Sequence, residues 1–384
     1  MKVVIVIDSF KGSLSSGSAG MAAAEGIKNA YPDADTLVLP LADGGEGTVE
    51  AIISASGGKL VSVDVTGPLG NTVTAKYGVI PERGRAIIEM SSAAGITLVP
   101  PERRNPLYTT TYGVGELIAD AIKAHGCRDF IIGIGGSATN DGGVGMLEAL
   151  GFSFLDKNGD EIPHGAIGIS KLEKIDVSGA LPELSECRFQ VACDVTNPLL
   201  GEHGCSTVFG PQKGASPDMI RDMDGWLADF AKFTECTLGR CDKDTSGAGA
   251  AGGLGFAFIS YLGAELSSGI DLVIESIGLE NRIKNADIVV TGEGRLDAQS
   301  AMGKAPVGVA RLAKKYGKPV IAFSGCIGDG AELCCDNGID AFFPIQRNVC
   351  TLSEAMDETN AYNNLKATAE QAFRLIKATS ERNY

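Results

Sequence analysis

The chain has 384 residues, of which 44% are hydrophobic and 21% charged, and 33 Lys and Arg against 48 Asp and Glu give it a formal net charge of −15. A chain of this length usually forms two domains, because a single hydrophobic core stops growing at about 250–300 residues. The acidic surface repels a phosphate backbone, and no apolar run reaches the roughly 18 residues of a membrane span, so neither nucleic acid nor a membrane is expected as a partner.

The cysteines and histidines point to no disulfide framework or zinc site. The ten cysteines form no C-x-x-C pair, and the three histidines lie far apart in the sequence. The apolar stretch that precedes Asp8 is only five residues long, which is shorter than a signal peptide needs. We therefore expect reduced thiols and a cytoplasmic protein, and homo-oligomer formation is left open.

Short β-branched runs alternate with longer helical patterns along the chain. Strands are expected at Val3–Ile7, Thr36–Leu39, Phe130–Ile134, Ile288–Thr291, Val320–Phe323 and Ala341–Ile345, and helices at Ser16–Ala30, Glu46–Ser54, Tyr112–Ala124, Ala305–Lys315 and Leu352–Ala378. This order predicts an α/β fold with a doubly wound, mostly parallel sheet.

Two regions interrupt that order and indicate a second domain. Residues 59–90 are typical of a β-meander, and residues 151–215 lack long helices, before helical patterns return. The simplest model is a doubly wound α/β domain with a second α/β domain inserted. The first comprises residues 1–60, 110–150 and 281–384, and the inserted domain comprises residues 61–109 and 151–280.

The most distinctive glycine cluster is Gly133-Ile-Gly-Gly-Ser-Ala-Thr-Asn-Asp-Gly-Gly143, between an apolar strand and a helix expected to open near Val144. Backbone N–H groups in such a loop, together with a helix N-terminus, form a cradle for phosphate or carboxylate. The loop is neither a Walker A motif nor a complete Rossmann fingerprint, because Ala138 stands at the third glycine. The alternative is an ordinary strand-to-helix turn.

Carboxylates also follow the first two predicted strands. Asp8 comes directly after the first strand, with Lys11 close behind, and Asp43 precedes two glycines after the second strand. Ligand sites of α/β proteins form at the carboxyl ends of parallel strands, so Asp8 is a candidate for holding a hydroxyl or a metal and Lys11 for holding an anion. The alternatives are a helix cap with a solvated lysine, and Asp43 as an N-cap with Glu46 completing a capping box.

A third loop, Thr291–Ser300, follows a further predicted strand. Arg295 and the nearby Lys304 are candidates for phosphate oxygens, and Glu293 or Asp297 for Mg²⁺ or a proton. The alternative is a surface loop whose opposite charges pair with one another.

The inserted region supplies a strand-end carboxylate and a cation. Asp194 follows the strand Phe189–Ala192, Asn197 precedes a proline, and Lys213 lies in a glycine-rich turn. Asp194 is equally well explained as a turn residue. Small residues at 247–253 more commonly let a helix approach its neighbour closely than bind a ligand.

Together these motifs supply the parts of a metal-assisted phosphoryl transfer: an anion cradle, cations, a Mg²⁺-competent carboxylate and a carboxylate that orients an acceptor hydroxyl. The protein-kinase motif set is missing from the sequence.

Seven motifs in chain order resemble the bacterial glycerate kinase type 1 family. They are Asp8-Ser-Phe-Lys-Gly-Ser, Ala42-Asp-Gly-Gly-Glu-Gly-Thr, Thr66-Gly-Pro-Leu-Gly, Gly133-Ile-Gly-Gly-Ser-Ala-Thr-Asn-Asp-Gly-Gly, Cys193-Asp-Val-Thr-Asn-Pro-Leu, Phe209-Gly-Pro-Gln-Lys-Gly-Ala and Thr291-Gly-Glu-Gly-Arg-Leu-Asp. The resemblance runs from residue 2 to about residue 375. Two small departures, Phe10 and Gly12, remove no chemically required group.

The resemblance implies ATP- and Mg²⁺-dependent phosphorylation of D-glycerate, with the active site in the cleft between two α/β domains. The expected product is 2-phosphoglycerate, and phosphorylation of the 3-hydroxyl to give 3-phosphoglycerate is the alternative.

Residue roles follow from the motifs and the resemblance as hypotheses. We expect catalytic roles for Asp194 (as proton acceptor), Lys11 and Arg295; substrate binding by Asp8, Ser9, Asp43, Asn197 and Lys213; nucleotide or phosphate binding by Gly135, Gly136, Ser137, Thr139, Asn140, Gly292, Gly294 and Lys304; and metal binding by Glu293 and Asp297.

Two functions of other classes compete with this interpretation. A nicotinamide-dependent dehydrogenase needs an acidic residue about 20 positions after the glycine loop, at the end of the next strand, and Asp156 is near that spacing. A non-catalytic sugar-acid binding protein needs no set of cations and carboxylates for phosphoryl transfer.

Overall fold

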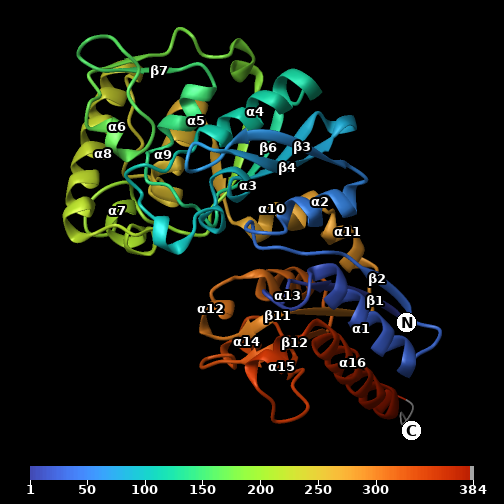
Figure 1. The fold of residues 1–384 in the computed structure, drawn as a ribbon. Coiled ribbons are helices and arrows are strands. Elements are labelled where there is room, and N and C mark those ends of the chain that lie inside the picture. The colour runs from blue at the N-terminus through green and yellow to red at the C-terminus, as the bar shows by residue number, and fades with distance from the viewer. Residues whose placement is uncertain (381–384) are drawn as a thin grey trace. The chain divides into compact units, whose positions relative to one another are not determined.

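The computed structural model describes residues 1–380 of the 384-residue chain (Figure 1). The chain forms two compact units. Unit 1 comprises Met1–Asp43, Glu50–Ser56 and Ile270–Tyr384, and unit 2 comprises Gly44–Val49 and Gly57–Gly269. Helices α2 (Thr48–Ser56) and α10 (Gly269–Ser276) each contain a boundary between the units. The mixed helix and strand content confirms the predicted α/β class.

Unit 1 is built on a five-stranded, fully parallel sheet. Its strands are β1 (Lys2–Ile7), β2 (Asp35–Val38), β11 (Ile288–Leu296), β12 (Val320–Ile327) and β13 (Ala341–Pro344). The order across the sheet is β13-β12-β11-β1-β2, and each neighbouring pair is parallel. The strand order therefore reverses between β1 and β11, as in a doubly wound sheet.

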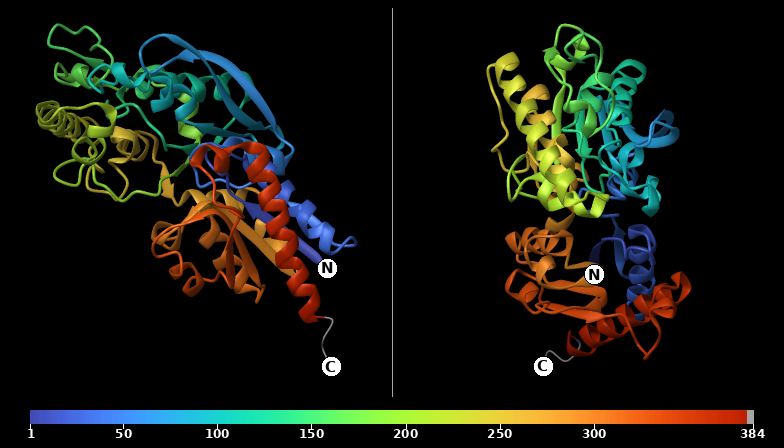
Figure 2. Two further views of the ribbon diagram at one scale, coloured as in Figure 1. Left: turned by 60° about the horizontal axis from the view of Figure 1, so that its bottom comes forward. Right: turned by 60° about the vertical axis from the view of Figure 1, so that its left-hand side comes forward.

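Helices cover both faces of the unit 1 sheet. They are α1 (Ser16–Ala30), α11 (Leu279–Lys284), α12 (Ala298–Ala301), α13 (Ala305–Lys315), α14 (Leu333–Asp336), α15 (Leu352–Met356) and α16 (Glu358–Ser380). Helices α1 and α16 lie side by side (Figures 1 and 2), and a Cβ on Gly26 of α1 would meet the Lys366 carbonyl at 2.1 Å. This close approach buries Ile27, Leu365 and Phe373 beneath the sheet. Helix α13 packs against β11 and β12 with a separate set of buried residues.

Unit 2 contains a six-stranded mixed sheet. Its strands are β3 (Lys59–Thr66), β4 (Thr72–Ile80), β5 (Arg85–Glu89), β6 (Asp129–Gly133), β9 (Arg188–Ala192) and β10 (Glu265–Ser267), and β7 (Ser153–Leu155) and β8 (Lys174–Asp176) form a separate pair. Strands β5, β6, β9 and β10 are parallel, and β3 and β4 extend the sheet as an antiparallel hairpin. The β-meander predicted at residues 59–90 is formed by β3, β4 and β5, whose neighbouring pairs are antiparallel.

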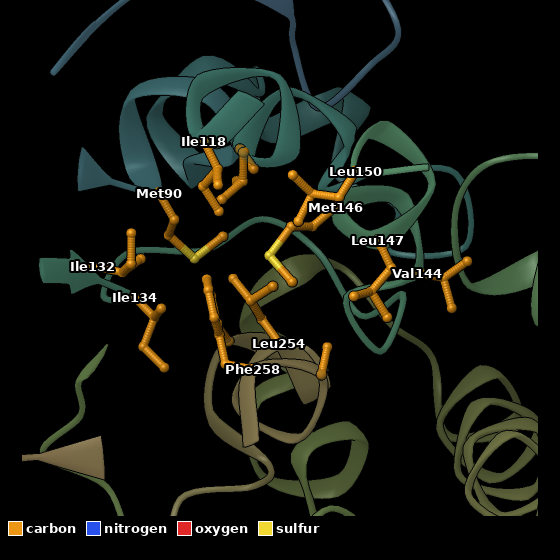
Figure 3. Packing of buried hydrophobic residues seen from close by; sticks show 14 of the residues in the cluster. Met90, Ile118, Ile132, Ile134, Val144, Met146, Leu147, Leu150, Leu254 and Phe258 are labelled. Carbon is orange, nitrogen blue, oxygen red and sulfur yellow. The ribbon is translucent and has the colours of Figure 1, made fainter. Parts of the chain in front are cut away.

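A large apolar core packs against this sheet. The helices of unit 2 are α3 (Ser91–Ala94), α4 (Tyr112–His125), α5 (Val144–Ala149), α6 (Ala166–Ile169), α7 (Cys205–Phe209), α8 (Pro217–Leu238) and α9 (Ala250–Leu262). Figure 3 shows Met146 of α5 directed toward Leu254 and Phe258 of α9, with Ile118 of α4 above them and Ile132 of β6 to one side. Four elements distant in sequence thus fix the place of the loop that follows β6.

Residues 110–150 are placed differently from the sequence prediction. The prediction grouped them with the two ends of the chain, but β6 pairs with β5 and β9, so these residues belong to the sheet of unit 2. The apolar run Phe130–Ile134 is equally suited to either parallel sheet, and only pairing with distant strands decides between them.

The predicted helix Leu352–Ala378 is interrupted. Asp357 leaves the helical conformation (φ −57°, ψ 128°) and separates α15 from α16. Its Oδ1 accepts a hydrogen bond from the Asn360 amide, as an N-cap side chain does. The continuous helical pattern concealed this cap.

Candidate active site

The carboxyl ends of β1 and β11 flank the point where the strand order of unit 1 reverses. Ile7 of β1 pairs with Gly292 of β11, so Asp8 and Glu293 follow at the same edge. In doubly wound sheets, this is the position at which ligands bind. Two of the predicted site residues therefore lie at the expected place in unit 1.

Asp8 is a buried carboxyl, 5% exposed, within a cluster of like charges. Burial raises its pKa to about 7, and the carboxylates of Asp43 and Glu293 act in the same direction. The Ser9 amide donates a 2.6 Å hydrogen bond to Asp8 Oδ1, and this bond and Lys11 limit the rise in pKa. Asp8 thus changes its protonation state near neutral pH.

Glu293 is a second, half-buried carboxyl of this edge. Burial raises its pKa, and the nearby charges of Asp297 and Asp43 add to that effect. Its Oε1 is buried and has no hydrogen-bond partner among residues 1–380. An oxygen in this condition costs about 1–3 kcal/mol unless a ligand, an ion or water satisfies it.

The predicted cations of unit 1 are exposed and paired. Lys11 Nζ lies 3.9 Å from Asp43 Oδ2, and Arg295 Nε lies 3.2 Å from Asp297 Oδ2. Lys304 Nζ donates to Gln299 Oε1 at 3.0 Å. Exposed pairs of this kind are weak, so a stronger anionic ligand can displace them.

Asp297 has a structural task in addition to its pairing with Arg295. Its Oδ1 accepts hydrogen bonds from the amides of Gln299 and Ser300, which caps α12. The sequence left open that this is a surface loop whose opposite charges pair with one another. Arg295 and Asp297 form such a pair in the structure.

The glycines of β11 are explained by packing. A Cβ on Gly292 would meet the Phe323 carbonyl at 2.1 Å, and one on Gly294 would lie 3.3 Å from Phe10 Cα. Both positions let neighbouring backbone approach, and they place no side chain at the edge.

In unit 2, the loop after β6 presents backbone donors. Within residues 1–380, no hydrogen bond uses the N–H groups of Gly135, Gly136, Thr139 and Asn140 as donors. Gly135 and Gly136 are exposed, whereas Thr139 and Asn140 are fully buried. The loop therefore has the unpaired amides that an anion cradle requires. Ser137 is half-buried and forms a β-bridge with Gly95.

Two side-chain atoms of the same loop are also buried without partners. They are Thr139 Oγ1 and Asn140 Oδ1, although Asn140 Nδ2 donates to Ser206 Oγ at 2.8 Å. Buried polar atoms in proteins are almost always satisfied, so these atoms mark a place for water or ligand.

The N-terminus of α5, which was expected to form part of the anion cradle, has little capacity to bind an anion. Helix α5 has only six residues, and the Gly143 amide ahead of it donates to Asp141 Oδ1 at 3.2 Å. Asp141 Oδ2 accepts from the Thr111 amide and hydroxyl, each at 2.8 Å. The anion-binding potential therefore lies in the loop amides and not in the helix terminus.

Lys213 lies beneath this loop and not on an open surface. Its side chain is 1% exposed, and Nζ donates to the Thr139 carbonyl at 2.6 Å. Burial lowers the pKa of Lys213 to about 8. The hydrogen bond to Thr139 thus holds the Lys213 ammonium within unit 2, and direct substrate binding by Lys213 stays a prediction.

Asp194 and Asn197 follow β9. Asp194 is exposed, and its Oδ1 accepts a 3.0 Å hydrogen bond from the Gly269 amide. Asn197 Nδ2 donates to the His203 carbonyl at 2.8 Å, which shapes its own loop. Asp194 lies at the carboxyl edge of the unit 2 sheet, because Ala192, Gly133 and Glu89 are aligned across β9, β6 and β5.

The sequence interpretation passed over Glu89 at this edge. Glu89 ends β5, and its Oε1 accepts a 2.8 Å hydrogen bond from the Val49 amide. Its strand β5 is antiparallel to β4, as the predicted meander requires, but it is also parallel to β6. The sequence did hold a signal for Glu89, because a carboxylate at the end of an apolar strand also marks Asp8. That signal was missed because β6, the parallel partner of β5, lies about 40 residues further along the chain.

The family model for the glycerate kinase family matches residues 3–377 of this chain. The chain belongs to the glycerate kinase family. It is 48% identical over 376 residues to "Glycerate kinase" of Haemophilus influenzae, covering 98% of this chain and 99% of that one. It is 49% identical over 365 residues to "Glycerate 2-kinase" of Escherichia coli strain K12, covering 95% of each.

A solved structure agrees with the family and the fold. A crystal structure of a Salmonella typhimurium LT2 protein, proposed to be a glycerate kinase 2, matches with a TM-score of 0.90 at 47% identity and covers 99% of both chains. The predicted resemblance to glycerate kinases is thus confirmed. Membership of a kinase family makes the chain an enzyme with a nucleotide substrate.

Two further observations bear on the alternatives. Asp156 follows β7, which pairs with β8 outside the six-stranded sheet, so it does not end the strand next to β6 as a dinucleotide site requires. Among residues 1–380, no helix is both long and apolar enough to span a membrane.

Proposed function

We propose that this chain transfers the γ-phosphoryl group of ATP to the 2-hydroxyl of D-glycerate, with Mg²⁺, and releases ADP and 2-phosphoglycerate. The observation that carries the proposal is the carboxylate cluster of Asp8, Asp43 and Glu293 at the strand-order reversal of unit 1. The family supports glycerate as acceptor, and the Escherichia coli relative, named a 2-kinase, supports the 2-hydroxyl.

The unit 1 carboxylates fit a magnesium ion. No group of three or more His, Cys, Asp or Glu side chains in the described part of the chain is arranged to hold a metal on its own. Mg²⁺ at phosphoryl-transfer sites usually takes only one or two carboxylates, and phosphates and water complete its shell. Glu293, with its unpartnered buried Oε1, suits this role, whereas the oxygens of Asp297 already cap α12 and pair with Arg295. When bound, Mg²⁺ supplies positive charge that offsets the phosphate oxygens.

Asp8 is the strongest candidate for the proton acceptor. A general base works best when its pKa lies near the working pH, and the pKa of Asp8 is about 7. In the transfer, the glycerate hydroxyl oxygen forms the new P–O bond, the bond from the γ-phosphorus to the bridging oxygen breaks, and the hydroxyl proton passes to the Asp8 carboxylate. Asp194, the acceptor expected from the sequence, is exposed and holds the Gly269 amide, so it is the comparison residue.

The remaining roles divide by charge. We assign Lys11, Arg295 and Lys304 to anionic oxygens of the substrates, because each is exposed and only weakly paired. The amides of Gly135 and Gly136 are assigned to the nucleotide phosphates, because they are exposed and have no internal acceptor.

Phosphorus NMR tests the proposed function. The enzyme is incubated with ATP, Mg²⁺ and D-glycerate, and the phosphomonoester signals are compared with those of authentic 2- and 3-phosphoglycerate. We expect ADP and 2-phosphoglycerate. Formation of 3-phosphoglycerate would overturn the assignment of the 2-hydroxyl alone, and ATP consumption that is independent of D-glycerate would overturn the acceptor.

A further inference from the structure

We infer that Lys213 is a positioning residue, which holds the loop after β6 at the Thr139 carbonyl and so fixes its exposed amides, those of Gly135 and Gly136, for the phosphate of the nucleotide. The inference rests on the proposed function for the identity of the anion. The underlying observation is the buried contact of Lys213 Nζ with the Thr139 carbonyl, at 2.6 Å.

The direction of the peptide group follows from its planarity. In a trans peptide, the carbonyl and the N–H point in opposite directions. Because the Thr139 oxygen points to the Lys213 ammonium, the N–H of the same peptide, carried by Asn140, points away from it. That N–H donates to no acceptor in residues 1–380.

Helix α9 also packs against the Thr139 carbonyl oxygen, through Gly252. A Cβ on Gly252 would meet the Thr139 carbonyl at 2.1 Å, and the Gly142 amide donates to the Gly252 carbonyl at 3.0 Å. The segment that makes this contact is strained. Ala251 has a φ of 53° and is the only non-glycine residue with positive φ among residues 1–380.

A bare lysine is an expensive group to bury, so its position calls for a compensating role. Lys213 ends a short 3-10 helix (Pro211–Lys213), and Asp141 and Cys205 are the acidic groups near its ammonium. Asp141 in turn holds Gly143 and Thr111 through its two oxygens. Lys213 thus holds the loop backbone at a carbonyl and Asp141 holds it at the Gly143 amide, whereas Thr139 Oγ1 and Asn140 Oδ1 stay unpaired.

The test is a Lys213→Met variant, which keeps the length of the side chain and removes the donor. We expect the KM for ATP to rise at least about tenfold, as the loss of a preorganised donor does, with the KM for D-glycerate changed less than about threefold. General destabilisation lowers the number of active molecules and leaves both KM values unchanged. Lys213→Arg, which keeps N–H donors, should give a smaller rise in the KM for ATP.

Two control variants separate positioning from stability. Met223→Ala removes buried apolar volume from α8 in the same unit, and should lower Tm without changing either KM. Lys232→Met removes an exposed lysine that pairs with Asp229 at 2.8 Å, and should change neither quantity. An unchanged KM for ATP in Lys213→Met would overturn the inference.

Hydrogen exchange decides the positioning role independently of glycerate chemistry. Without substrates, peptides that cover residues 135–143 should exchange faster in Lys213→Met than in wild type, with Met223→Ala as the reference for global loosening. Equal exchange in Lys213→Met and Met223→Ala would contradict the positioning role. Failure of wild type to phosphorylate D-glycerate would instead count against the proposed function.

Discussion

The two parallel-strand edges of this enzyme carry opposite kinds of chemistry. In unit 1, the edge offers the side chains of Asp8, Asp43 and Glu293, which are acidic and partly or fully buried. In unit 2, the strand-end carboxylates of Glu89 and Asp194 already accept the amides of Val49 and Gly269. The loop after β6 offers uncharged backbone amides, and a buried lysine and a buried aspartate hold that loop. Proton transfer and cation binding need titratable side chains, whereas binding of an anion needs only fixed N–H groups. We therefore propose that unit 1 carries out proton transfer and cation binding, and that the loop of unit 2 binds the anion.

The largest expected effect is at Asp8. Asp8→Asn removes the proton acceptor and should lower kcat by about 10²–10⁴-fold in steady-state assays. Because its folded pKa is raised, the Asp8 carboxyl contributes stability that is lost as pH rises through about 7. The Asn variant should therefore be at least as stable as wild type at pH 8, so that lost activity is not lost folding.

Asp194→Asn is the matched variant at the other edge. We expect its kcat to fall less than about tenfold, because its Oδ1 holds the Gly269 amide and an asparagine oxygen also accepts that bond. A larger loss in Asp194→Asn than in Asp8→Asn would reverse the division of tasks between the two edges.

The second effect concerns the cation. Glu293→Gln keeps the shape of the side chain and removes its charge, so the Mg²⁺ concentration for half-maximal rate should rise about tenfold to a hundredfold, the equivalent of one charged interaction. The measurement is a Mg²⁺ titration at fixed ATP. Asp297→Asn, at the α12 cap, should leave that Mg²⁺ concentration nearly unchanged. If Asp297→Asn raised the Mg²⁺ concentration as much as Glu293→Gln does, Asp297 would be the residue that binds the cation.

The third effect tests whether packing holds the unit 2 loop. Gly252→Ala and Gly263→Ala both place a Cβ at positive φ, of 70° and 63°, but only the first meets backbone, while the second has open space around it. Gly263→Ala should cost about 1–2 kcal/mol of unfolding free energy and Gly252→Ala about 1–3 kcal/mol more. Urea denaturation measures both changes in unfolding free energy. Equal changes in the two variants would show that the loop moves at little cost to accept the new Cβ.

The smallest effect is a pH dependence of stability in unit 2. Glu148 lies with Oε2 3.3 Å from His164 Nε2, and burial raises its pKa from 4.5 to about 8. Between these pH values, the folded state keeps a proton that the unfolded state has lost, so wild-type stability falls with rising pH, by at most about 1.4 kcal/mol per pH unit. The Tm difference between Glu148→Gln and wild type should therefore grow from pH 5.5 to pH 7.5. Glu235→Gln, an exposed change on α8, should show no such trend.

The sequence predicts the carboxylates of unit 1 better than the contacts that hold the loop of unit 2. A carboxylate at a strand end is recognised in the sequence as an Asp or Glu that follows an apolar run. The sequence alone therefore predicts Asp8, Asp43 and Glu293 as site residues. The supports of the unit 2 loop were not visible in this way. Lys213, Ser206 and Thr111 contact the loop only after folding brings together residues 30 to 74 positions apart, and a lysine in a glycine-rich turn is usually exposed. For the same reason, the strand Phe130–Ile134 was assigned to the wrong sheet.

The pH dependence of kcat/KM for D-glycerate tests the central claim most directly, because kcat/KM reports the protonation of the free enzyme. Between pH 5.5 and 7.5, the wild-type value should rise as the Asp8 carboxyl loses its proton, with an inflection at or below about 7, because bound Mg²⁺ offsets the charge of Glu293 that raises the pKa of Asp8. In Asp8→Asn, the remaining activity should lack this inflection. An Asp8→Asn enzyme that keeps the wild-type inflection would place the proton acceptor elsewhere in the molecule.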